Sequence, residues 1–163
     1  MTPNRLFITL FGSGLSPKAP GTVGSFVALL LGVALLEILP MSTFFMLTLT
    51  ITIIGIFEIN KYERLTKSHD DKSIVIDELS GMWIALMFAL STAQTLEYAY
   101  AKEIAIVGSF VAFRLFDIWK PSTIGTIDRK VKGGLGVMGD DVLAGVAGGL
   151  LTIVLLLVLD KVM

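Results

Sequence analysis

Two pairs of acidic residues stand where a polar stretch of the chain leads into a long apolar run: Asp77-Glu78 and Asp140-Asp141. Carboxylates are favoured near a helix N-terminus, so each pair could act only as a helix cap. Adjacent residues on a helix point about 100° apart, however, so both members of a pair cannot share one simple cap. Carboxylate oxygens also suit a hard divalent cation, with water completing its coordination. The two pairs therefore predict a cation site where these apolar runs begin.

A second group of charged residues ends the fourth apolar run. Arg114, Asp117 and Lys120 are spaced by three, which predicts one helical face for all of them. A buried ion pair with a snorkelling lysine would explain this pattern without any chemistry. A basic–acidic–basic stripe also suits a phosphate group together with its metal ion.

A glycine-rich segment, residues 12–25, directly precedes the first apolar run. Glycines allow backbone amides to turn inward, and a helix N-terminus attracts an anion, to which Lys18, Thr22 and Ser25 could donate. No Gly-Lys-Ser/Thr sequence follows, so this is not a nucleotide-binding phosphate loop. A flexible connection into the membrane is the alternative.

A basic segment, residues 128–132, precedes a second glycine-rich turn. It could bind anionic headgroups or set the membrane topology. The single histidine, His69, lies in a polar loop beside Asp70, where a solvated side chain is the usual outcome. Taken together, these segments favour one phosphate site over several unrelated features.

The elements that would position these residues are apolar helices. Hydrophobic residues make up 54% of the 163 residues, above the roughly 45–50% of soluble domains, and the mean hydropathy is +0.81. We expect a single membrane-embedded domain over residues 1–163. Five apolar segments are predicted as helices: Ser25–Leu39, Thr43–Ile59, Leu79–Thr95, Ile104–Trp119 and Val142–Leu159. Because a span takes about 20 residues, the first and fourth could be tilted or partly re-entrant. The expected fold is an all-α integral membrane bundle of about five transmembrane or partly re-entrant helices.

Basic residues indicate the orientation of this bundle. With five spans, ten of the 13 Lys and Arg residues lie on the side that holds the N-terminus and the two long loops, against Lys102 and Lys161 opposite. The positive-inside rule places that side in the cytoplasm. Ten of the 14 acidic residues fall there too. A net charge of −1 argues against nucleic acid as a partner, and the absence of cysteine excludes disulfides and thiolate metal sites.

Four blocks in order resemble the phosphatidylglycerophosphatase A family: GSGLSPKAPGTVGS, IVIDE followed by GMW, FRLFDIWKP, and IDRKVKGGLGVMGDDVLAG. Each block alone is weak, but the ordered set is specific and covers almost the whole chain. The resemblance implies Mg²⁺-dependent removal of the terminal phosphate from phosphatidylglycerophosphate, which gives phosphatidylglycerol. It also implies a multi-pass protein of the bacterial inner membrane whose site faces the cytoplasm.

The resemblance, together with the motifs described above, assigns roles to individual residues as follows. The expected catalytic residues are Asp70, Asp77, Glu78, Asp117, Arg114, Lys120, Asp128 and Arg129. The expected metal ligands are Asp77, Glu78, Asp117, Asp140 and Asp141. The expected phosphate-binding residues are Lys18, Thr22, Arg114, Lys120, Arg129 and Lys132.

Other functions fit the sequence less well. A small transporter or scaffold would place polar residues at mid-span, where this chain is largely apolar. A phosphatidyl transferase would carry an Asp-Gly-x2-Ala-Arg signature, and histidine-based membrane phosphatases need two histidines; neither is present. A phosphatase that acts on another lipid phosphomonoester remains a second enzymatic interpretation.

Overall fold

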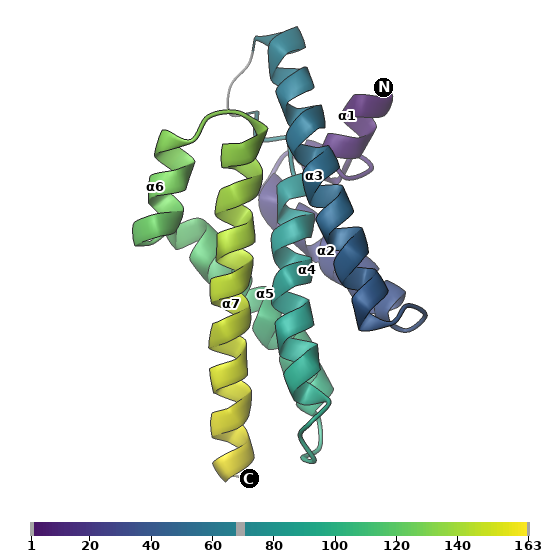
Figure 1. Ribbon diagram of the computed structural model, residues 1–163, viewed down its shortest axis with the longest axis vertical. Helices are drawn as coiled ribbons and strands as arrows, with labels where there is room; N and C mark the ends of the chain where they lie inside the picture. Colours follow the sequence, from purple (N-terminus) through teal and green to yellow (C-terminus); the bar gives the residue numbers. More distant parts are fainter. Residues whose placement is uncertain (1, 68–70, 163) are drawn as a thin grey trace.

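The structure is a computed structural model that describes residues 2–67 and 71–162, and these residues form helices and connecting turns without a β-strand. Figure 1 shows the helices as an elongated bundle. They are α1 (Pro3–Ile8), α2 (Pro20–Leu36), α3 (Met41–Thr66), α4 (Ile76–Ala93), α5 (Ala101–Trp119), α6 (Ser122–Lys130) and α7 (Gly134–Val162), with one 3₁₀ turn at Ser13–Leu15.

Helix α4 lies at the centre of the bundle and contacts α2, α3, α5 and α7. Its side chains Met82, Ala85 and Leu86 are fully buried. Helices α3 and α5 run toward the end of the bundle where α4 and α7 begin, and the C-terminus lies at the opposite end (Figure 1). This antiparallel arrangement brings polar segments that are far apart in the sequence to one end.

Prolines mark several helix boundaries. Pro20 is the first residue of α2, where its missing N–H would have no helical partner in any case. Pro40 and Pro121 immediately precede α3 and α6. Each of the five predicted apolar segments falls on a helix, so the all-α prediction is confirmed. The short helix α6 was not predicted, because its sequence has no long apolar run.

Three helices, α3, α4 and α7, are long and apolar enough to cross a membrane, and α2 is a shorter apolar helix. The C-terminal half of α7 exposes large aliphatic side chains: Leu150, Leu151, Val154, Leu155, Leu157 and Val158. An apolar surface of this kind is costly in water and favourable in lipid. The protein is therefore a membrane protein.

Glycines allow α4 and α7 to approach closely. A Cβ atom on Gly145 of α7 would collide with the backbone of Gly81 in α4. Small residues at such crossings are typical of helices that pack in a membrane, where close contact replaces the hydrophobic driving force. The contact sets the positions of residues one turn away on both helices, which include Glu78 and Asp141.

Candidate active site

Three carboxylates from three different helices converge near the end of the bundle where α4 begins. Glu78 comes from the first turn of α4, Asp117 from the last turn of α5, and Asp141 from α7. One oxygen of each lies within 4.8 Å of the other two. Glu78 and Asp141 are buried, with 7% and 3% of their surfaces exposed. Carboxylates that share so small a volume repel one another unless positive charge compensates them.

Arg114 supplies part of that compensation. Its Nη1 atom lies 2.7 Å from Oε2 of Glu78 and 2.6 Å from Oδ2 of Asp117. Its Nη2 atom donates to the hydroxyl of Thr22 at 3.3 Å. The side chain is only 13% exposed. In this structure the guanidinium therefore holds two carboxylates and the start of α2 in place.

The first turns of α2 complete this side of the cluster. The Ser25 hydroxyl lies 2.5 Å from Oε2 of Glu78, and it accepts a hydrogen bond from Arg114 at 3.1 Å. One turn earlier, a Cβ atom on Gly21 would collide with Oε1 of Glu78. Glycine at position 21 thus allows the α2 backbone to lie directly against the carboxylate.

Two further carboxylates adjoin the cluster. Asp140 forms an ion pair with Lys120. Asp77 accepts a hydrogen bond from the backbone N–H of Glu78 at 3.0 Å, and its charge interacts with those of Asp140 and Asp117. The structure therefore brings together all five acids that the sequence analysis assigned to metal binding.

Two local predictions were wrong. Helix α5 ends at Trp119, and Lys120 adopts a left-handed conformation with φ of 45°, so Lys120 does not continue the helical face of Arg114 and Asp117. Asp140 and Asp141 do not stand at a helix entrance, because α7 already begins at Gly134. The Asn60 side chain on α3 accepts a hydrogen bond from the N–H of Gly134 at 2.8 Å and so stabilises this earlier start.

The loop before α4 is anchored by a different acid. The Tyr62 hydroxyl donates to Asp71 at 2.6 Å, and the Ser73 N–H donates to the same carboxylate at 3.0 Å. The hydrogen bond from Tyr62 holds the pKa of Asp71 below its ordinary value. The carboxylate of Asp71 thus stabilises the loop through these two hydrogen bonds.

The cluster has the composition of a divalent-cation site. Its five carboxylates face two cations, Arg114 and Lys120, which leaves a formal charge of −3. Oδ2 of Asp141 is buried and makes no hydrogen bond to any residue in the described ranges. A buried carboxylate oxygen without a partner is costly, and oxygen donors of this kind suit Mg²⁺. The residues present therefore fit such an ion, with Glu78, Asp117 and Asp141 as the closest set.

Other predicted site residues form no ion pair with this cluster in the described residues, or cannot be placed. Lys18, Arg129 and Lys132 are exposed, and none forms an ion pair with the five carboxylates in the part of the chain that the structure describes. His69 and Asp70 lie outside the described residues, as does the side chain of Asp128.

Sequence reasoning missed one contact of the site. Ser25 was considered only as a donor to an anion, whereas its hydroxyl contacts Glu78. Its position one turn after Gly21 was the available signal, because that spacing places both residues on the same face of a helix.

The chain is similar to known proteins over most of its length. The family model described as Phosphatidylglycerophosphatase A matches residues 6–156. The chain is 40% identical to "Phosphatidylglycerophosphatase A" of Escherichia coli (strain K12), over 88% of this chain and 78% of that protein. It is 37% identical to the protein of the same name from Haemophilus influenzae, over 90% and 84% of the two chains.

A further relative carries a different name. A protein of Bacteroides thetaiotaomicron, provisionally named as a phosphatidylinositol-3-phosphatase, is 37% identical over 85% of this chain and 84% of its own length. No solved structure matches the chain.

Proposed function

Because this chain belongs to the phosphatidylglycerophosphatase A family, and is thus a phosphoric monoester hydrolase, we propose that it hydrolyses phosphatidylglycerophosphate to phosphatidylglycerol and phosphate. Two relatives whose names state this activity support the choice of substrate. Phosphatidylinositol 3-phosphate is the competing substrate, because a third relative is named for it.

The convergence of Glu78, Asp117 and Asp141 is the observation that carries this proposal. We propose that these three carboxylates hold Mg²⁺, with Asp77 and Asp140 beside them. A bound Mg²⁺ ion would neutralise phosphate charge and position or activate water. Arg114 and Ser25 keep Glu78 in the orientation that ion binding needs.

The remaining cations of the site act on the phosphate group in this proposal. Lys120 lies at the edge of the cluster through its ion pair with Asp140, and it is 31% exposed, so it can turn toward an incoming anion. Thr22 presents its hydroxyl at the start of α2 beside Arg114. Lys18, Arg129 and Lys132 would attract the headgroup from the same end of the bundle. Fixed cations near the phosphate oxygens are the main contribution of a protein to phosphoryl transfer.

The test is release of phosphate from phosphatidylglycerophosphate by the purified protein in detergent. We expect activity that is lost in excess chelator and restored by Mg²⁺. Asp117→Asn should reduce turnover to background, since it removes one of the three converging carboxylates. Full activity in chelator would overturn the metal assignment, and near-normal turnover by Asp117→Asn would overturn the site. Faster hydrolysis of phosphatidylinositol 3-phosphate would overturn the substrate, and ligand flux into vesicles without phosphate release would favour a transporter.

We also propose that the site faces the cytoplasm of a bacterial inner membrane, on the basis of the basic loops. The chain has no cysteine, so single cysteines can report the orientation. Lys72→Cys lies at the end that carries the site and Gln94→Cys follows the opposite end of α4; both positions are exposed. A membrane-impermeant thiol reagent should label position 94 in intact spheroplasts and position 72 only after lysis. The reverse pattern would contradict this orientation.

A further inference from the structure

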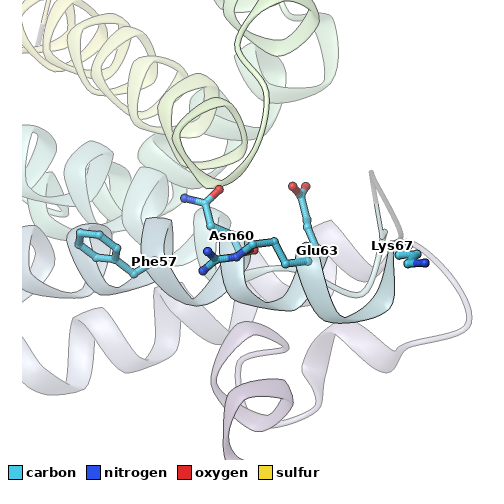
Figure 2. Close-up of a pocket in the computed structure, with 5 residues that line it drawn as sticks. Phe57, Asn60, Glu63 and Lys67 are labelled. Carbon is cyan, nitrogen blue, oxygen red and sulfur yellow. Dashed lines mark hydrogen bonds between the residues drawn. The ribbon is translucent and has the colours of Figure 1, made fainter.

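The last three turns of α3 form one wall of an open cleft that does not belong to the carboxylate cluster. The cleft has a volume of about 700 Å³ and is lined by Phe57, Asn60, Glu63, Arg64 and Lys67. Figure 2 shows these side chains along α3, beside the start of α7. None of the three converging carboxylates comes from α3. The cleft is therefore a separate feature of the same end of the bundle.

The lining changes from apolar to cationic along the helix. Phe57, Asn60 and Arg64 are spaced by three or four residues, which places them on one face of α3, and Lys67, the residue that follows the helix, also lines the cleft. Phe57 ends the apolar part of this candidate span and is 67% exposed, while Arg64 and Lys67 lie two to three turns beyond it and are exposed. A phospholipid has the same polarity gradient, from acyl chain to phosphate.

The two other polar residues of the cleft are engaged with the start of α7. Asn60 accepts the hydrogen bond from the Gly134 N–H. Oε2 of Glu63 lies 3.9 Å from the point where a Cβ atom on Gly133 would stand. An acidic side chain is favoured in that place by the dipole of α7. The carboxylate in the cleft is thus directed toward α7.

In the residues that the structure describes, the two cations of the cleft, Arg64 and Lys67, form no hydrogen bond with α7. The Nε atom of Arg64 donates to the backbone oxygen of Asn60 at 3.2 Å, which holds the guanidinium against the helix. Neither Arg64 nor Lys67 forms an ion pair with a carboxylate anywhere in residues 2–67 and 71–162. Two cationic groups thus face an open cleft at the boundary of an apolar span, where an anionic headgroup would satisfy both.

We propose that this cleft binds an anionic phospholipid, with the phosphodiester on Arg64 and Lys67 and an acyl chain against Phe57. The lipid is held as an intact ligand and is not hydrolysed. The site extends the protein's interactions beyond the proposed reaction, and it does not depend on which phosphomonoester the carboxylate cluster takes.

The test is native mass spectrometry of the full-length protein with added dioleoyl phosphatidylglycerol or dioleoyl phosphatidylcholine. We expect a bound phosphatidylglycerol that phosphatidylcholine does not replace. One basic side chain near an anionic headgroup contributes roughly fivefold in affinity, so Arg64→Gln with Lys67→Gln should weaken this binding about 25-fold. The matched control, Lys61→Gln with Lys72→Gln, removes two exposed charges at the same end but outside the lining of the cleft and should retain the lipid.

Further measurements distinguish lipid binding in the cleft from binding of a free anion there. They also distinguish it from lipid binding at the carboxylate cluster. Phe57→Ser should weaken phosphatidylglycerol binding, and inorganic phosphate should not displace the lipid. Equal loss in the two double variants would overturn the proposal in favour of general surface charge. Displacement by inorganic phosphate would overturn it in favour of a soluble-anion site. Phosphatidylglycerol retained by the cleft variant but lost in Asp117→Asn would place the lipid at the carboxylate cluster. These outcomes are distinct from a failure of phosphate release, because they measure binding alone.

Discussion

Ser25→Ala tests whether the start of α2 controls the carboxylate cluster. The substitution removes a hydroxyl that is fully buried, 2.5 Å from Oε2 of Glu78 and 3.1 Å from Nη1 of Arg114. It deletes one oxygen atom and adds none, so α2 keeps its path beside Glu78. The hydroxyl also lies 2.8 Å from the backbone oxygen of Gly21 within α2, so the variant removes this contact together with those to Glu78 and Arg114, without a change in packing.

The size of the effect follows from the charge of the acceptor. A hydrogen bond to a charged group contributes roughly 1.5–3 kcal/mol. If this energy maintains the productive position of Glu78, its loss lowers kcat/KM about 10- to 150-fold. The Mg²⁺ concentration for half-maximal activity should rise as well, because Glu78 is one of the proposed ligands. Arg114 still forms its ion pair with Glu78 in this variant, so we expect only part of the activity to be lost.

The assay is phosphate release from phosphatidylglycerophosphate in detergent across a range of Mg²⁺ concentrations. Ser109→Ala is the matched control: Ser109 is equally buried, but its hydroxyl donates to the backbone oxygen of Ile106 at 2.9 Å, within α5. Its kinetics should stay within about twofold of the parent protein's. The reasoning fails if Ser25→Ala keeps the parent kcat/KM and Mg²⁺ dependence, or if both variants lose activity equally.

Three further variants test the packing and the loops through thermal unfolding in detergent. Gly145→Ala should lower stability by about 1–3 kcal/mol and reduce activity, because the added Cβ collides with Gly81 and separates α4 from α7. Asn60→Ala should cost about 0.5–2 kcal/mol, since it removes the acceptor for the first N–H of α7. Asp71→Asn should lower the Tm at pH 7 and have a smaller effect near pH 3. The bond from Tyr62 lowers the pKa of Asp71 in the folded protein, so the carboxylate stabilises the fold above its unfolded pKa and loses this effect as pH falls through the folded value.

Control variants and one contrary outcome test these three predictions. Gly139→Ala is the control for Gly145→Ala. Its added Cβ would meet Ile127 at an ordinary 3.5 Å, so this variant should unfold at the parent temperature. Asn60→Asp retains an acceptor oxygen and should keep most of the stability that Asn60→Ala loses. A Tm difference for Asp71→Asn that grows toward acid pH would reverse the expected sign and exclude the proposed role of the Tyr62 hydrogen bond.

Much of the architecture follows from the sequence, because long apolar runs must satisfy their backbone hydrogen bonds internally in lipid. That constraint placed a helix on each of the five predicted segments. Helix α6 was not predicted, because its nine mostly polar residues contain no long apolar run. The ordered motifs, which need no geometry, indicated the family.

The arrangement of the site depended on tertiary contacts that no local pattern specifies. From the sequence, all five acids were equivalent candidates for metal binding. Asp141 rather than Asp140 joins Glu78 and Asp117, because the close approach of Gly145 to Gly81 sets the rotation of α7 against α4. A change of one residue along a helix turns a side chain by about 100°, so the packing of distant helices decides which of two adjacent carboxylates faces the cluster.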